Sequence, residues 1–318
     1  ALVRAAEFSR QDVRDQVVTL ISTMYLQAVS TASRIDAARS QQATAEALYN
    51  RAVTMKQAGM VAGIEVLRAQ VQSQNQRQRV IYFENEFAKQ KLALARAIGL
   101  PLGQSFTLSD AMPYHALDAM PLDEAVRTAL AGRSDRKAAA EMLRAAEANR
   151  QAAIAASFPS IGFNADYGDI GPTWDTLLGT YSVSAHVRIP LFQGGRERGR
   201  ILQAGAALAQ QRAQLADLDT RIEYEVRAAF LDVTSADERV RVAQTAADLA
   251  SQQLTQAQDR FSAGIASHVE VVQAQEAVAT ASDNLIGALY AHNLAKAVLA
   301  RALGMVESGT ERFLGGQS

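Results

Sequence analysis

The 318-residue sequence contains no cysteine, so disulfides, thiol nucleophiles and thiolate metal sites are excluded. The four histidines are scattered and none has a ligand partner at metal-binding spacing, so we expect no metal and no cofactor. No uncharged apolar run reaches the 18 or so residues of a membrane-spanning helix. The formal net charge of -1 gives no basic surface for nucleic acid. No catalytic triad order or phosphate loop is present, so an enzyme is not expected.

What the sequence does contain is a repeat. The stretch from Leu26 to Gly99 recurs from Leu231 to Gly304 without a gap, at one constant offset (264 − 59 = 205). Ala58-Gly59 matches Ala263-Gly264, and both copies end on a similar segment closed by glycine. A register kept for this long predicts two copies of one structural unit.

The repeats are rich in strong helix formers and poor in helix breakers. From about Val13 to Gln57 there is no proline or glycine, which predicts one helix about 65 Å long. A second helix, from about Arg198 to Ala263, would extend about 100 Å. Such lengths are typical of coiled coils and helical repeats rather than compact domains.

Two rows of small and apolar residues follow the second long helix at a spacing of seven, the pattern of a coiled-coil seam. The rows are Leu208, Leu215, Ile222, Ala229, Ala236, Ala243, Ala250 and Ala257, and Val226, Val233, Val240, Ala247, Leu254 and Phe261. The other faces are polar, so a solvated coiled coil remains an open interpretation.

Each long helix ends at an Ala-Gly pair, where glycine can adopt a left-handed cap. A second helix then begins near Gly63 or Ser267 and ends at Gly99 or Gly304. Ser267 to Glu270 has the pattern of a capping box. The sequence therefore predicts two antiparallel helical hairpins, each with a tight tip.

Between the repeats, residues 101–121 are loop-like, a short helix follows Pro121, and an alanine-rich helix extends to Ser157. Two segments, Ser160–Tyr167 and Tyr181–Ile189, then alternate between apolar and polar residues, which predicts a β-hairpin. Aromatic residues, including Trp174, lie near the connection. The pattern fits strands of an outer-membrane barrel, and it also fits a half-buried hairpin of a soluble protein.

These segments together resemble the TolC family of outer-membrane efflux proteins. The resemblance rests on residues 157–161 entering a strand, residues 189–196 leaving one, Arg133-Ser134-Asp135 at a helix start, and the duplicated tips. It covers nearly the whole chain.

The resemblance implies a fold that is mainly α with a small β part: two repeated long helical hairpins and one β-hairpin of a TolC-like protomer. It implies a homotrimer that spans the outer membrane of a Gram-negative bacterium, contacts its lipid and extends into the periplasm. Such ducts conduct substrates passively in tripartite efflux or type I secretion. Their partners are a periplasmic adaptor protein and an inner-membrane pump.

The resemblance also assigns candidate sites. The periplasmic tip, with its gate and adaptor-docking surface, is expected at Gly59, Glu65, Phe261, Gly264, Glu270 and Gln273. Facing lipid we expect Ile161, Phe163, Val183, Val187 and Ile189; facing the lumen we expect Ser182, Ser184, His186 and Arg188. The usual gate tyrosine and arginine are replaced by Phe261 and Ala266, so the family's ionic lock is not expected here. Glu270 fits a gate residue and a helix cap about equally well.

Family members carry a strand hairpin ahead of each long helix, whereas this sequence has only the second one. We therefore expect about 100 residues or more upstream, by comparison of the two repeats. The predicted divisions are a first helical hairpin (1–100), a linker with short helices (101–157), the membrane β-hairpin (158–195), a second helical hairpin (196–305) and a tail (306–318). A soluble coiled-coil scaffold or adaptor is the alternative function.

Overall fold

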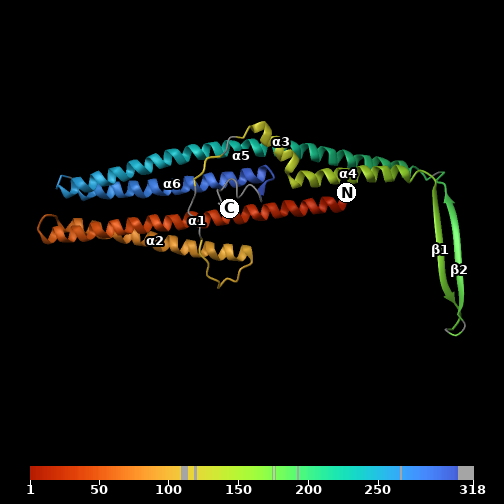
Figure 1. Ribbon diagram of the computed structural model, residues 1–318, viewed down its shortest axis with the longest axis horizontal. Helices are drawn as coiled ribbons and strands as arrows, with labels where there is room; N and C mark the ends of the chain where they lie inside the picture. The colour runs from red at the N-terminus through yellow and green to blue at the C-terminus, as the bar shows by residue number, and fades with distance from the viewer. Residues whose placement is uncertain are drawn as a thin grey trace. The chain divides into compact units, whose positions relative to one another are not determined.

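The computed structural model describes residues 1–108, 114–117, 120–173, 175, 177–191, 193–265 and 267–306. Helices dominate these residues, and two strands form one antiparallel sheet (Figure 1). In chain order the elements are α1 (Leu2–Gln57), α2 (Gly63–Ile98), α3 (Leu122–Gly132), α4 (Ser134–Ala155), β1 (Ser160–Ile170), β2 (Leu178–Arg188), α5 (Arg196–Ser262) and α6 (His268–Ala302). The predicted order of elements is therefore confirmed. Trp174, Phe192, Ala266 and residues 307–318 lie outside the described residues.

The chain forms two compact units, and α1 and α5 each contribute to both. One unit comprises Ala1–Gln11 and Ser134–Arg221; the other comprises Asp12–Arg133 and Ile222–Ser318. The second unit contains the two helical hairpins, α1 with α2 and α5 with α6, each folded back on itself at a short turn (Figure 1).

The element ends differ from the predicted ones by a few residues in most cases. The largest difference is at the start of α1, which begins at Leu2 rather than near Val13. Residues 2–12 contain neither proline nor glycine, so nothing interrupts the helix there. The strands are also longer at the hairpin end, because β1 extends to Ile170 and β2 begins at Leu178.

The two copies of the repeat have the same backbone hydrogen bonds at their helix ends. Gly59 and Gly264 both have φ of 73°, and Gly99 and Gly304 have φ of 79° and 70°. The amide after each glycine donates to the carbonyl five residues earlier, as in Met60 to Met55 and Ile265 to Arg260, both 2.9 Å. This bond is that of a Schellman cap. The predicted glycine caps are confirmed in both copies.

The predicted seam on α5 is confirmed by burial. Most of its positions have less than a tenth of their surface exposed: Leu208, Ile222, Val226, Ala229, Val233, Ala236, Val240, Ala243, Ala250, Ala257 and Phe261. Leu249 and Val242, beside the seam, are largely exposed. Because the central positions are mostly alanine, neighbouring helices can approach α5 closely.

Near the tips, the seam joins a small core between three helices. Leu48 of α1, Ala257 and Phe261 of α5, and Val271 and Ala274 of α6 are all buried together. This cluster holds the first hairpin against the second. Polar pairs continue the contact: Arg34 of α1 donates to Asp283 of α6 at 2.8 Å.

In the other unit, α4 packs beside the first part of α5. Arg136 donates from Nε to one oxygen of Asp219 at 2.6 Å and from a terminal nitrogen to the second oxygen at 3.3 Å. This two-pronged geometry fixes the helix pair more specifically than a single contact would. Beyond α4, the chain turns into the β-hairpin.

We predict that the alanine at position 257 is required for close packing. Ala257→Leu adds three carbons to a buried position and is expected to lower the free energy of unfolding by about 1–3 kcal/mol. The matched control is Gln256→Leu at the neighbouring exposed position, which is expected to change it by less than about 0.5 kcal/mol. Urea unfolding followed by circular dichroism measures both; equal effects would contradict the packing argument.

Candidate functional sites at the helix tips and on the β-hairpin

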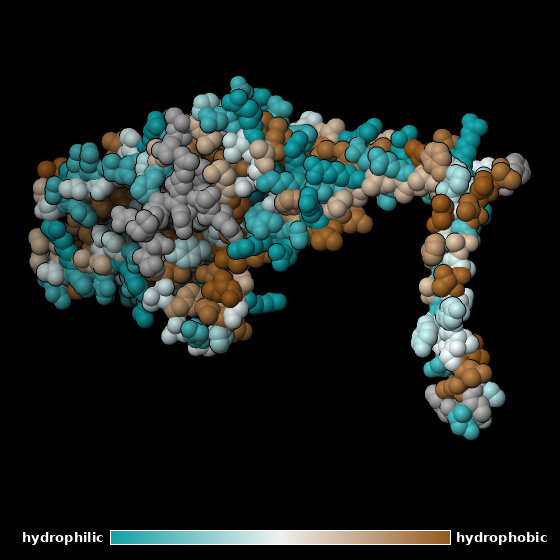
Figure 2. Space-filling view, turned by 45° about the vertical axis from the view of Figure 1, so that its right-hand side comes forward, coloured by the Kyte–Doolittle hydropathy of each residue, from teal (hydrophilic) through white to brown (hydrophobic). Residues whose placement is uncertain are grey.

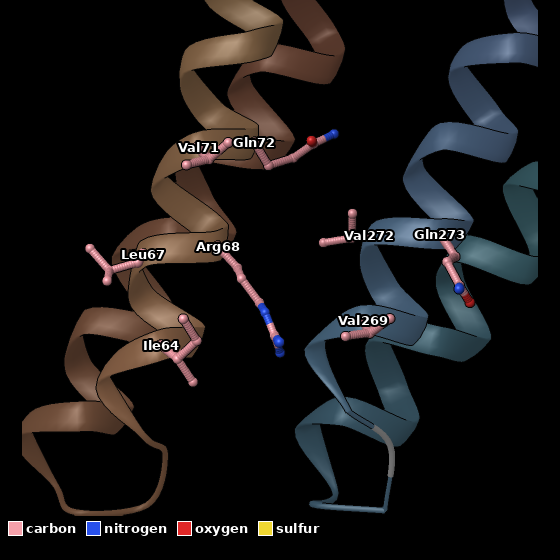
Figure 3. Close-up of a pocket in the computed structure, with 8 residues that line it drawn as sticks. All are labelled: Ile64, Leu67, Arg68, Val71, Gln72, Val269, Val272 and Gln273. Atoms are coloured by element: carbon pink, nitrogen blue, oxygen red, sulfur yellow. The ribbon is translucent and has the colours of Figure 1, made fainter.

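The two hairpin tips lie next to each other and form an apolar groove of about 410 Å³. Its walls are the first turns of α2 and α6 (Figure 3). The lining residues are Ile64, Leu67, Arg68, Val71, Gln72, Val269, Val272 and Gln273. The repeat offset of 205 pairs Ile64 with Val269 and Leu67 with Val272, so both walls carry aliphatic residues at these two matched positions.

The apolar lining residues are unusually exposed for their type. Ile64, Leu67 and Val71 have 51%, 58% and 60% of their surface exposed. Val269 and Val272 point from α6 toward α2, and Arg68 extends from α2 into the space between the helices (Figure 3). One turn deeper, the Gln72 amide donates to Glu276 at 2.6 Å and joins the two walls.

The two predicted acidic tip residues each lie beside an arginine. Arg68 donates to Glu65 at 2.8 Å within α2, and Arg260 of α5 lies 3.3 Å from Glu270 of α6. Each carboxylate is thus partly neutralised within its own chain. Glu65 and Glu270 occupy equivalent places but use different partners, since position 273 carries glutamine where Arg68 stands in the first copy.

The predicted capping box is wrong. Ser267 is the N-cap of α6, with φ of -83° and ψ of 157°, but its side chain makes no capping hydrogen bond. The Glu270 amide donates to the Ser267 carbonyl at 3.1 Å instead. The side chain of Glu270 is directed to Arg260, because a charged partner on the facing helix is available.

The remaining predicted tip residues have different surroundings. Gly59 and Gly264 form the turns, and Gln273 lines the groove. Phe261 is only 6% exposed and belongs to the core cluster under the tip. The phenyl ring fills the core at this position. Ala266 lies outside the described residues.

Sequence reasoning missed the groove and Arg260. The groove had a signal: Ile64 and Val269, and Leu67 and Val272, are matched apolar residues in two copies, at places where a water-exposed helix end would tolerate polar ones. No sequence pattern pointed to Arg260, because its partner Glu270 lies on another helix and only the fold brings the two side chains together.

The β-hairpin is the second candidate site. Its register pairs Ile161 with Val187, Phe163 with Ala185, Ala165 with Val183 and Tyr167 with Tyr181. Directly paired residues lie on the same face of a sheet, so these four pairs form a continuous run of apolar and aromatic residues on one face. The next pair on that face, Asp169 with Gly179, ends the run near the hairpin turn. Ser182, Ser184, His186 and Arg188 pair with Asp166, Asn164, Gly162 and Ser160 on the other face. The two predicted faces therefore coincide across both strands.

Large apolar side chains of the hairpin are exposed to solvent in the isolated chain. Phe163, Tyr167 and Tyr181 have 75%, 85% and 83% of their surface exposed, and hydrophobic residues are visible along the hairpin in Figure 2. Ile189 lies one residue beyond the end of β2, so its predicted place within the strand is wrong. A hairpin with such exposure needs a partner surface.

One polar-face residue lies differently from its neighbours. The imidazole of His186 rests over Gly162, where an added Cβ would come within 2.4 Å of the ring. Glycine at 162 therefore gives the ring room to lie against the sheet.

The sequence pattern of the outer membrane efflux protein family matches residues 125–305, which include the β-hairpin and the second helical hairpin. The chain belongs to the outer membrane efflux protein family. The resemblance noted from the sequence is thereby confirmed. None of the described helices offers a stretch apolar enough and long enough to cross a membrane.

Individual members agree with this assignment. The probable efflux pump outer membrane protein SepC of Pseudomonas putida is 28% identical over 62% of this chain and 42% of its own length. The pyoverdine export outer membrane protein OpmQ of the same species is 24% identical over 94% of this chain and 64% of its own. The chain thus spans less than two thirds of the length of these relatives.

A solved structure establishes the fold. The open-state MtrE outer membrane channel of Neisseria gonorrhoeae superposes with a TM-score of 0.82 at 18% identity, covering 96% of this chain and 70% of that one. The mainly helical fold with one small sheet is therefore that of the efflux channels. Within the described residues, no group of three or more histidine or acidic side chains could hold a metal ion.

We predict opposite effects for the same substitution at two glycines. Gly264→Ala places a Cβ in the left-handed region and is expected to destabilise the protein by about 1–2 kcal/mol. Gly205→Ala lies inside α5 with open space around the new Cβ, and is expected to stabilise by up to about 1 kcal/mol. Thermal and urea unfolding give both values. A loss of stability at both positions would refute the role of the positive φ.

Proposed function

We propose that this protein is a subunit of an outer-membrane exit duct, in a tripartite efflux or type I secretion system. The family match across residues 125–305 carries this proposal, because it joins the exposed hairpin and the long helices in one transport family. The duct conducts substrates passively and performs no catalysis. It lies in the outer membrane of a Gram-negative bacterium and extends into the periplasm.

The sheet supports assembly with further strands. The described sheet has two strands in the order β1–β2, so each strand has one unpaired edge. Unpaired backbone groups in hydrocarbon cost several kcal/mol each, so a membrane sheet must close into a barrel. We propose that closure is reached in a homotrimer, in which each copy contributes strands to one barrel.

The apolar face of the hairpin faces lipid in this proposal. Ile161, Phe163, Val183 and Val187, with Ile189 just beyond the strand, meet the acyl chains, while Ser182, Ser184, His186 and Arg188 line the lumen. The run of apolar pairs from Ile161–Val187 to Tyr167–Tyr181 supports this assignment. The alternative function, a soluble coiled-coil scaffold, does not explain why one face of the sheet is apolar and exposed.

The tip groove is the proposed docking site of a periplasmic adaptor protein, which in turn recruits an inner-membrane pump. Three exposed aliphatic residues from α2, together with the exposed Val269 and the partly exposed Val272 of α6, offer an apolar surface of the kind that receives an amphipathic helix. Since Glu65 and Glu270 are paired with arginines, we expect closure of the tip to depend on packing more than on ion pairs.

We predict that the full-length protein forms conducting channels in planar lipid bilayers, and that Val187→Arg prevents this. A charge on the lipid face near the midplane costs about 2–4 kcal/mol. The matched control, Ser184→Arg on the opposite face, is expected to leave assembly intact and alter only ion selectivity. Normal channels from Val187→Arg together with failed assembly of Ser184→Arg would reverse the facing assignment. Absence of conductance in the unmodified full-length protein would favour the soluble scaffold.

We predict that Leu67→Glu weakens binding of the periplasmic adaptor protein with which the proposed duct assembles. A carboxylate placed in an apolar contact loses hydration without gaining a partner, so the affinity is expected to fall at least about tenfold. Gln70→Glu adds the same charge to an exposed position of α2 outside the groove, and its affinity is expected to stay unchanged. Surface plasmon resonance measures both; equal losses would place docking elsewhere.

A further inference from the structure

The linker between the repeats is fastened to α5 and α6 by a cluster of polar groups. The hydroxyl of Tyr114 donates to Asp237 of α5 at 2.6 Å, and Lys296 of α6 donates to the carbonyl of His115 at 2.7 Å. Lys296 is 1% exposed, so its ammonium group depends on such contacts. The segment 114–117 is therefore attached at two neighbouring points.

His292 lies beneath this attachment. Its side chain is fully buried, its ring centre is 5.3 Å from that of Tyr114, and its Nε2 is 3.9 Å from the Asp237 oxygen that Tyr114 already uses. Within the described part of the chain, neither ring nitrogen has a hydrogen-bond partner. The imidazole is thus enclosed by the attachment without contributing a hydrogen bond to it.

Two charged side chains, Lys296 and Asp237, act on the imidazole of His292. Lys296, one turn further along α6, repels a positive imidazole, and Asp237 of α5 attracts one; Asp237 is also paired with Arg241 at 2.7 Å. On α1, Arg34 acts on the neighbouring Tyr290. Burial and then Lys296 lower the pKa of His292, and Asp237 offsets this only in part. The closed attachment therefore favours the neutral ring.

We propose that protonation of His292 releases the linker segment 114–117 from α5 and α6. A charged ring in this place would have two N–H donors, while the Asp237 oxygen beside it already accepts from Tyr114 and the buried ammonium group of Lys296 repels it. Lifting the segment admits water to the ring, so acid favours the released form. This proposal does not depend on the proposed transport function.

The internal repeat provides a matched variant. The offset of 205 places Phe87 opposite His292 and Lys91 opposite Lys296 (292 − 87 = 205). An aromatic residue that cannot be protonated therefore occupies the equivalent position beside the equivalent lysine. His292→Phe keeps a planar ring of similar size and removes the titration.

The sign of the pH dependence follows from the lowered pKa. In the released form His292 titrates near its ordinary pKa of about 6.5, and in the closed form below it. The released form thus binds more protons between these values, so the closed form is favoured above about pH 6.5 and loses its advantage as the pH falls. One proton limits the change in the equilibrium to about 30-fold between about pH 7.5 and pH 5.

The experiment measures the distance between spin labels at Ala116→Cys and Gln253→Cys, in a sequence that has no other cysteine. The second site is on α5, about 25 Å along the helix from Asp237. We expect one narrow distance distribution at about pH 7.5, and a second, broad population at about pH 5. With His292→Phe, the distribution is expected to stay narrow at both values, whereas His115→Gln is expected to keep the acid response.

An unchanged distribution in the unmodified protein, or an acid response that persists in His292→Phe, would overturn the proposal. If circular dichroism shows that His292→Phe does not fold, Tyr114→Phe provides a second test. Removing its hydroxyl loosens the attachment to Asp237, so the midpoint of release is expected to move to higher pH. A midpoint that stays in place or falls would equally overturn the proposal.

Discussion

Close packing along the small-residue seam of α5 is the constraint on which the helical unit depends. Helices this long gain little from intrinsic propensity unless an apolar face is buried against neighbours. The central alanines of α5 allow α6 and the first hairpin to approach, and the core around Phe261 continues the contact to the tip. If the seam carried larger residues, the two tips would separate and the groove between them would be lost.

The second constraint acts on the β-hairpin. Its exposed apolar face and its unpaired strand edges are unfavourable in water, so the hairpin is expected to pack against other strands. Helices and hairpin therefore have opposite requirements. The helices satisfy their backbone groups internally and need only lateral packing, whereas in the proposed duct the hairpin depends on neighbouring strands and on contact with lipid.

Much of the fold could be predicted from the sequence, because local residue patterns that occur in both repeats determine the helices and turns. The helices follow from the absence of breakers, the turns from Ala-Gly pairs, and the strand faces from alternation. The register then showed that apolar residues such as Ile161 and Val187 are directly paired. The tip chemistry could not be predicted in the same way. Whether Glu270 meets Ser267 or Arg260 depends on which helix lies beside it, and a capping pattern does not contain that information.

The partial similarity of the two groove walls has a consequence for recognition. A ligand that spans the groove meets similar aliphatic residues at both ends, because Ile64 and Leu67 of α2 correspond to Val269 and Val272 of α6. The two walls differ in charge, since Arg68 corresponds to Gln273 and Val71 corresponds to Glu276. A ligand with one acidic end is therefore expected to place that end at the α2 wall, and Arg68→Gln would weaken this preference.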